Sequence, residues 1–345
     1  MIRFNSDYLE GAHPKILERL LETNLEQTPG YGEDAYCEYA RKLIREKCGA
    51  PEAYVQFLVG GTQTNLTVIS SILRPHQGVL CADTGHINVH ETGAIEATGH
   101  KVLPLDSEDG KLQAWQVQKA CEDHWNDADH EHMVQPGMVY ISHPTENGTL
   151  YTKKELEDLC MVCRKYGLPL FLDGARLGYG LMAENTDVTW QALAQCTDVF
   201  YIGGTKVGAL FGEAVVISNP SLAKDFRYLI KQRGGMLAKG RLLGLQFTVL
   251  LEDGLYEEIS KKAVGQAMRL REAFLNRGYS LLYDSYTNQQ FPILPKGHAK
   301  QLSKNYAFAF WKDMDEKHCA VRFCMSWATK EEDIEALLRD LGSLK

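Results

Sequence analysis

The sequence contains no long uninterrupted apolar run, and its nine cysteines follow no regular spacing. A membrane-spanning helix needs about 20 consecutive apolar residues, so we expect neither a membrane span nor a membrane partner. The first seven residues lack the apolar core of a secretory signal peptide. Because disulfide frameworks belong to oxidising compartments, we expect reduced thiols and a cytoplasmic location.

The sequence also lacks basic tracts, internal repeats and low-complexity segments. Its formal net charge is -8, and charged residues make up 24% of the chain. This mildly acidic balance gives no electrostatic reason to expect a nucleic acid partner. Cys160 and Cys163 have no second cysteine pair at zinc spacing, so we expect no metal site.

What the chain does have is an alternation of short apolar runs and helical patterns over its first 218 residues. Helical patterns cover residues 62–73, 91–98 and 153–166. Seven apolar runs predict strands, at residues 55–59, 79–82, 101–105, 138–142, 168–173, 199–202 and 214–218. Continuous apolar strands joined by helices favour an α/β fold with a mostly parallel, seven-stranded sheet covered on both faces.

The pattern changes in the second part of the chain. Helical patterns over 237–251 and 255–277 are followed by strand-like runs and a last helix over 330–341. The strand-like runs lie at 291–294, 306–311 and 320–326. With 345 residues, the chain is long enough for two domains. We predict a large domain over residues 1–254, which includes the N-terminal segment, and a small α+β domain over 255–345.

Polar motifs follow four of the predicted strands, at the edge of a parallel sheet where ligands bind. Gly60-Gly61-Thr62 precedes a helix, and such a turn can hold a phosphate on free backbone N–H groups or serve only as a cap. Asp173 ends a buried strand and needs a cationic or donor partner, either a protonated pyridine nitrogen or the nearby Arg176.

Lys206 and His86 complete this set. Lys206 lies among small residues at a strand end, where partial burial would lower its pKa and suit a Schiff-base amine; the alternative is a surface lysine. His86 could stack on an aromatic ring, act as a base, or do neither. Together, a phosphate cradle, an acid, a lysine and an imidazole are what pyridoxal 5'-phosphate requires.

Motifs along nearly the whole chain resemble the threonine aldolase and β-eliminating lyase family of pyridoxal-phosphate enzymes, above all its low-specificity L-threonine aldolase branch. The most specific is Leu172-Asp173-Gly174-Ala175-Arg176-Leu177, followed roughly thirty residues later by Thr205-Lys206. The others are Asn5-Ser6-Asp7, Gly30-Tyr31-Gly32-Glu33-Asp34, Gly61-Thr62-Gln63-Thr64-Asn65-Leu66, His86-Ile87 with Glu91-Thr92-Gly93-Ala94, Gly234-Gly235-Met236 and Val321-Arg322-Phe323. The resemblance implies the aspartate-aminotransferase-like fold, known as fold type I.

The resemblance also implies roles for the matching positions. Lys206 would hold the cofactor aldehyde, Asp173 would pair with the pyridine nitrogen, and His86 would stack on the ring. The cofactor-binding set is Gly61, Thr62, His86, Asp173, Arg176, Thr205 and Lys206. The substrate-binding set is Ser6, Tyr31, Arg176 and Arg322. Tyr31 would reach the site of a neighbouring subunit in a homodimer or a homotetramer.

The chain departs from the family pattern where a catalytic histidine is usual, because Glu146 stands there. The catalytic base is therefore open among Glu146, His143 and His86. Thr205 replaces a usual serine, and Leu237 replaces a usual arginine.

The implied activity is cleavage of L-threonine, L-allo-threonine or other β-hydroxy-α-amino acids to glycine and an aldehyde. The rival hypotheses are β-elimination, amino-group transfer, and a catalytically silent binding protein of the same fold. The products distinguish them: glycine with an aldehyde, pyruvate with ammonia, or a keto acid with an aminated acceptor.

Overall fold

The computed structural model describes residues 1–344 and is built on a seven-stranded mixed sheet. Its strand order is β2-β8-β7-β6-β5-β3-β4, and β8 alone runs antiparallel to its neighbours. The strands are β2 (Tyr54–Leu58), β3 (Gln77–Ala82), β4 (Lys101–Leu105), β5 (Gln135–Ser142), β6 (Leu170–Asp173), β7 (Val199–Gly203) and β8 (Glu213–Ile217). The predicted α/β fold and its mostly parallel sheet are confirmed.

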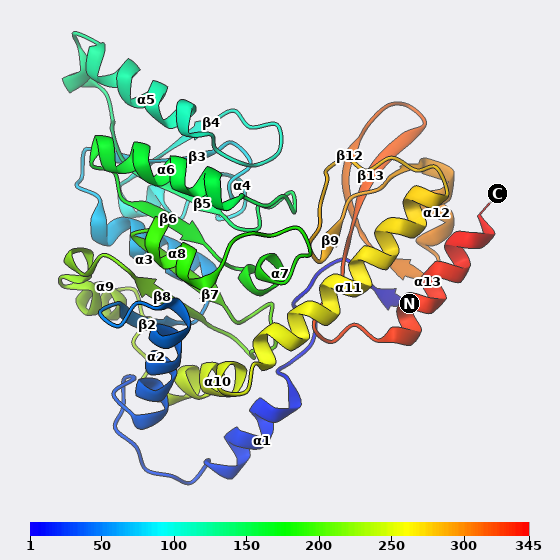
Figure 1. Cartoon of the computed structure of the whole chain (residues 1–345), viewed down its shortest axis with the longest axis horizontal. Helices are drawn as coiled ribbons and strands as arrows, with labels where there is room; N and C mark the ends of the chain where they lie inside the picture. The colour runs from blue at the N-terminus through cyan, green and yellow to red at the C-terminus, as the bar shows by residue number, and fades with distance from the viewer. Residues whose placement is uncertain (345) are drawn as a thin grey trace.

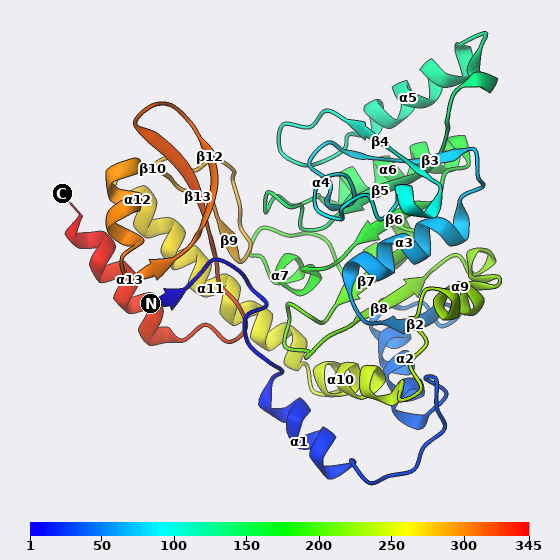
Figure 2. The same cartoon turned by 180° about the vertical axis from the view of Figure 1, so that it is seen from behind.

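Helices cover both faces of this sheet because its central strands are apolar on both faces. On β6, Leu170 and Leu172 pack into one core, while Phe171 between them packs into the other. Helices α5 (Ala114–Asn126), α6 (Lys153–Tyr166) and α8 (Trp190–Cys196) cover one face (Figure 1). Helices α3 (Gly61–Ile72) and α9 (Phe226–Gln232) cover the other (Figure 2).

The remaining helices surround these layers or belong to the C-terminal part of the chain. They are α1 (Pro14–Glu22), α2 (Ala35–Cys48), α4 (His86–Val89), α7 (Leu177–Leu181), α10 (Arg241–Glu252), α11 (Leu255–Asn276), α12 (Lys296–Leu302) and α13 (Glu331–Ser343). None of the helices in residues 1–344 combines the length and the apolar composition that a membrane span requires.

The C-terminal part forms a second, antiparallel sheet, and α11 leads to it from the large sheet (Figure 1). Its strands pair in the order β10-β13-β12, and β9 also pairs with β13. They are β9 (Gln289–Gln290), β10 (Ile293–Pro295), β12 (Ala309–Asp313) and β13 (His318–Cys324). A domain division near residue 255 remains a prediction.

The N-terminal segment, which the sequence analysis assigned to the large domain, begins with a strand that pairs with the C-terminal part of the chain, and its domain assignment stays a prediction. Strand β1 (Ile2–Arg3) pairs in parallel with β11 (Tyr306–Ala307), in the C-terminal part of the chain. The reason is apolar burial: the Phe4 ring lies 6.2 Å from the rings of both Tyr306 and Phe323.

Three local predictions were wrong. Residues 91–98 form no continuous helix, because Thr92 and Gly93 adopt positive φ angles and only a 3-10 turn follows at Glu96–Thr98. The strand expected over 306–311 divides into β11 and β12, which pair with different strands. The helix expected from 237 begins only at Arg241.

Candidate active site

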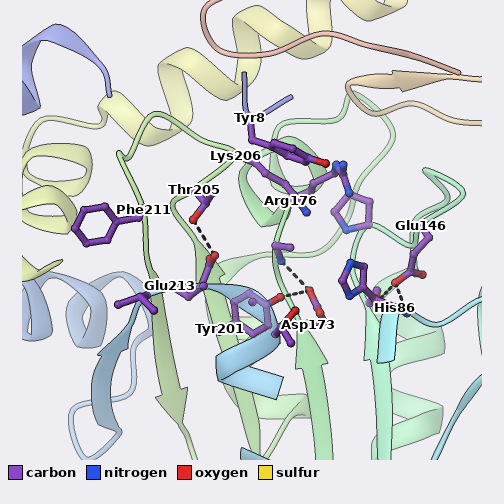
Figure 3. A pocket seen from close by; sticks show the side chains of 17 residues that line it. Tyr8, His86, Glu146, Asp173, Arg176, Tyr201, Thr205, Lys206, Phe211 and Glu213 are labelled. Carbon is purple, nitrogen blue, oxygen red and sulfur yellow. Dashed lines mark hydrogen bonds between the residues drawn. The ribbon is translucent and has the colours of Figure 1, made fainter. Parts of the chain in front are cut away.

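A cavity of about 300 Å³ lies at the carboxyl ends of the parallel strands. It brings together eight of the predicted positions from five separate segments of the chain (Figure 3). These eight are Gly61, Thr62, His86, Glu146, Asp173, Arg176, Thr205 and Lys206. Ser6, Tyr31, His143 and Arg322 are not among the residues that line it.

Asp173, at the end of β6, is buried and accepts hydrogen bonds on both carboxylate oxygens. Tyr140 Oη and Asn65 Nδ2 donate to Oδ2 over 2.6 and 3.1 Å. Tyr201 Oη and the backbone N–H two residues further on donate to Oδ1. Burial alone would raise the pKa of Asp173, but the charge of His86 and these hydrogen bonds outweigh it and lower the pKa. The cavity therefore contains a fixed negative charge.

Arg176 pairs with Asp7 and not with Asp173. Its Nε and Nη2 donate to the two carboxylate oxygens of Asp7 over 2.7 and 2.9 Å. Asn288 also donates to Asp7, over 2.9 Å. Burial would raise the pKa of Asp7, but the charges of Arg176 and Lys206 lower it to about 2. This pair joins the N-terminal segment, the cavity and the loop before β9.

Lys206 follows β7 and is buried beside the cavity. Burial and the positive charge of Arg176 lower its pKa, while Asp7 and Asp173 oppose this shift. Within residues 1–344, its amine forms no hydrogen bond or ion pair. Gly203 lets the end of β7 approach the backbone of Ala175 closely, because a Cβ at position 203 would lie 2.3 Å from the Ala175 carbonyl oxygen. The lysine is thus a buried amine with a lowered pKa and space in front of it.

The turn before α3, which the sequence analysis interpreted as a phosphate cradle or a helix cap, lies at the cavity. Gly61 and Thr62 are the first residues of α3, and both line the cavity. A Cβ at Gly60 would meet no atom within 4 Å, and one at Gly61 would lie 3.1 Å from Tyr201 Oη. The free N–H groups of the first helical turn can therefore face the cavity.

Glu146 lies beside His86 in the loop after β5. Its Oε1 accepts from Ser142 Oγ over 2.7 Å and from the His86 backbone N–H over 3.0 Å. Burial raises the pKa of Glu146; the Ser142 hydrogen bond lowers it, and the charge of Asp173 adds to the rise. The carboxyl group can therefore exchange protons closer to neutral pH than an ordinary glutamate.

His86 has a carboxylate partner of its own, and His143 does not. His86 Nδ1 lies 2.8 Å from Oε1 of the buried Glu91. Burial alone would lower the pKa of His86, but the Glu91 hydrogen bond and the charge of Asp173 raise it. Burial lowers the pKa of His143 to about 4, and the ring lies outside the cavity lining.

Ser6 and Arg322 lie outside the cavity lining, but each has a buried polar atom that forms no hydrogen bond within residues 1–344. Arg322 donates from Nη1 to Gln289 Oε1 and from Nη2 to the Asn5 carbonyl, both over 3.3 Å. Arg322 Nε and Ser6 Oγ are buried without a hydrogen-bond partner in the described part of the chain.

Tyr31 lies on the outer surface, with a φ angle of 60°. Its side chain lines a shallow surface hollow together with Arg227, Tyr228 and Met236. Lys231 Nζ lies 4.9 Å from the centre of the Tyr31 ring. Tyr31 is therefore not part of the cavity that contains Lys206.

Glu213 is a functional candidate that the sequence analysis missed. It begins β8, lines the cavity, and accepts hydrogen bonds from Thr205 Oγ1 over 3.0 Å and the Gly204 N–H over 3.2 Å. Burial raises the pKa of Glu213 to about 8, although the charge of Lys206 opposes this. The sequence feature that could have identified it is the position of this glutamate directly before the apolar run at 214–218.

Comparison with known proteins gives matches along the whole chain. The family model for beta-eliminating lyases matches residues 4–294. The low specificity L-threonine aldolase of Pseudomonas sp. is 30% identical, covering 99% of this chain and 97% of its own. The counterpart in Pseudomonas aeruginosa is 29% identical, with coverage of 98% and 96%.

Solved structures give the same picture. Leishmania major threonine aldolase is 44% identical, with a TM-score of 0.96 and coverage of 99% of both chains. A Thermus thermophilus aspartate aminotransferase is only 14% identical, with a TM-score of 0.72 and coverage of 99% of this chain and 90% of its own. The second likeness shows the fold alone.

Replacing Asp7 by Asn should destabilise the protein strongly, because Arg176 would remain buried without a counter-charge. Breaking such a pair costs about 3–5 kcal/mol, measurable as the free energy of unfolding in urea. Glu331→Gln is the matched control, since it removes an exposed partner of Arg269 and should change little. Equal effects of the two substitutions would contradict the importance of the buried pair.

Replacing Glu213 by Gln should change how stability depends on pH. Between about pH 5 and pH 8, Glu213 keeps its proton in the folded protein, whereas in the unfolded chain it is ionised. Stability therefore falls as the pH rises through this window. The variant loses this contribution, and its melting temperature should fall less across the window. The exposed Glu108→Gln is the control, and identical pH curves for Glu213→Gln and wild type would refute the assignment.

Proposed function

The chain belongs to the beta-eliminating lyase family, and within it we propose a retro-aldol activity that cleaves L-threonine, L-allo-threonine and other β-hydroxy-α-amino acids to glycine and an aldehyde. Support comes from relatives named threonine aldolases that match nearly the whole chain, at 30% identity in Pseudomonas sp. and 44% in Leishmania major. The observation that carries the proposal is one cavity containing Lys206, Asp173, Glu146 and the α3 N-terminus.

The cavity fits pyridoxal 5'-phosphate, on which enzymes of this family depend in general. The fit rests on three groups: the open N-terminus of α3 for a phosphate, the negative Asp173 for a pyridine nitrogen, and the unpartnered amine of Lys206 for an aldehyde. When bound, the cofactor would supply an electron sink for the charge that develops at the substrate's α-carbon. Thr205 would belong to the same binding set.

Asp173 and His86 would hold the ring from two directions. Asp173 stays ionised, and its tyrosine partners fix its orientation, so it favours a protonated ring nitrogen. His86 lines the same cavity and would stack on the ring face. Arg176 uses Nε and Nη2 for Asp7, which leaves Nη1 for cofactor or substrate.

Arg322 and Ser6 would hold the substrate carboxylate. Both have buried polar atoms without a partner, and an arginine fork suits a carboxylate. Fixing the carboxylate orients the bonds around the α-carbon and so selects the bond that breaks.

Glu146 is the base that we assign to the β-hydroxyl proton. Its Oε1 is occupied by Ser142 and His86, which leaves Oε2 to accept the proton. The raised pKa brings it closer to neutral pH, where proton transfer is most effective. His143 is a poorer candidate because it does not line the cavity.

The family name also makes β-elimination a specific second candidate. It would release ammonia and a keto acid in place of glycine and an aldehyde; the keto acid is pyruvate from a three-carbon substrate and 2-oxobutyrate from L-threonine or L-allo-threonine. A homodimer or homotetramer, in which Tyr31 completes a neighbour's site, is part of the proposal and agrees with the position of Tyr31 outside its own cavity. A cytoplasmic location stays a prediction.

The protein supplied with pyridoxal 5'-phosphate and L-allo-threonine should release acetaldehyde and glycine in equal amounts. Lys206→Ala should lower turnover by about 1000-fold or more, because an essential amine is lost. Lys224→Ala, on an exposed loop, is the control. 2-Oxobutyrate and ammonia as products would favour β-elimination, and full activity of Lys206→Ala would refute the site.

Replacing Glu146 by Gln should lower kcat by about 100-fold or more, with a smaller change in KM, because the base is lost and the shape is kept. In the wild type, activity should rise with pH as Glu146 ionises, at a higher pH than for an ordinary glutamate. Stopped-flow and steady-state rates measured against pH test this. If the Glu146→Gln variant shows the same rise of activity with pH, that rise must come from the ionisation of another group.

A further inference from the structure

A line of hydrogen-bonded side chains joins two residues that line the cavity, His86 and Asp173. The Nδ2 atom of Asn65 donates to Glu91 Oε1 over 2.7 Å and to Asp173 Oδ2 over 3.1 Å. The same Glu91 oxygen lies 2.8 Å from His86 Nδ1. Asn65 and Glu91 do not line the cavity, whereas His86 and Asp173 do. The line therefore connects two groups that would contact the cofactor through two that would not.

Burying the Glu91 side chain in this position lowers the stability of the fold. Its side chain is 0% exposed, and its Oε2 is buried without a partner in residues 1–344. An incompletely hydrogen-bonded buried carboxylate reduces stability. Stability therefore does not account for Glu91, and its geometry draws attention to His86, the one ionisable side chain within residues 1–344 that it hydrogen-bonds.

The contact fixes the chemistry of the imidazole. A carboxylate can only accept, so the proton of neutral His86 must be on Nδ1, and Nε2 is the nitrogen left for the cavity. We propose that Glu91 is a positioning residue that sets the tautomer and orientation of His86. Asn65, which donates to both carboxylates, holds Glu91 at a fixed position relative to Asp173. This rests on the proposed function, in which His86 faces the cofactor.

Other charged groups also face the imidazole. Glu91 and Asp173 favour its protonated form, and Lys206 disfavours it. Glu146 contacts the backbone N–H of His86, and the His90 ring lies 5.6 Å away. Among these groups, Glu91 alone hydrogen-bonds the ring, so its removal should have the largest effect on ring orientation and protonation.

Nitrogen-15 NMR of histidine-labelled, cofactor-free protein tests the proposal without relying on catalysis. In the wild type at high pH, the His86 signals should show the proton on Nδ1. In Glu91→Gln, the side-chain carbonyl can still accept but the charge is gone, so the protonation midpoint of His86 should move to lower pH. Glu96→Gln is the matched control, since Glu96 is exposed in the same segment.

Two outcomes would overturn the proposal: a proton on Nε2 in the neutral wild type, which needs no variant, or an unchanged midpoint in Glu91→Gln. Kinetics add a second readout. Glu91→Gln should lower kcat by about tenfold or more with a smaller change in KM, and Glu91→Asp should retain more activity than Glu91→Ala. A protein that cleaves no β-hydroxy amino acid would refute the proposed function while the NMR result still stood.

Discussion

A buried carboxylate must be hydrogen-bonded on both oxygens, and for Asp173 the register of three neighbouring strands meets this requirement. Tyr140 comes from β5, Asp173 ends β6, and Tyr201 comes from β7. Parallel pairing places Ser142 beside Asp173 and Leu172 beside Phe200. A shift of one residue in either pairing would turn the tyrosines to the other face and leave the carboxylate without donors. The sheet and the site therefore depend on the same register.

Four ionisable groups that line the cavity or pair with a residue that lines it fall into two kinds. Asp7 and Asp173 have strong partners, and their pKa values fall despite burial. At Lys206 and Glu213 the opposing charges and hydrogen bonds are smaller than the effect of burial, which lowers the pKa of the lysine and raises that of the glutamate. Fixed charges can orient a cofactor, whereas groups near neutrality can exchange protons. This division follows from the partners that each group has and not from the residue types.

The sequence was sufficient for features that depend on neighbours along the chain. Gly61, Asp173 and Lys206 each lie close to a predicted strand end, and open parallel sheets place such positions at one edge. The pairing of Arg176 with Asp7, and the link from His86 to Asp173, depend on strand order, register and the path of the N-terminal segment. No local pattern contains that information. For the same reason, the proximity of Arg176 to Asp173 in sequence suggested an ion pair that the structure does not contain.

The glutamate at position 146 changes the charge of the cavity and not merely the identity of a base. A histidine there would be neutral when it accepts a proton, whereas Glu146 must be negative, close to the negative Asp173. That repulsion and burial raise its pKa, and a positive His86 partly offsets them. Protonation of His86 and ionisation of Glu146 therefore favour each other. The Glu91 carboxylate, by favouring the charged imidazole, would also help Glu146 to be ionised. The residue proposed to position the ring would thus influence the proposed base through charge, without contacting it.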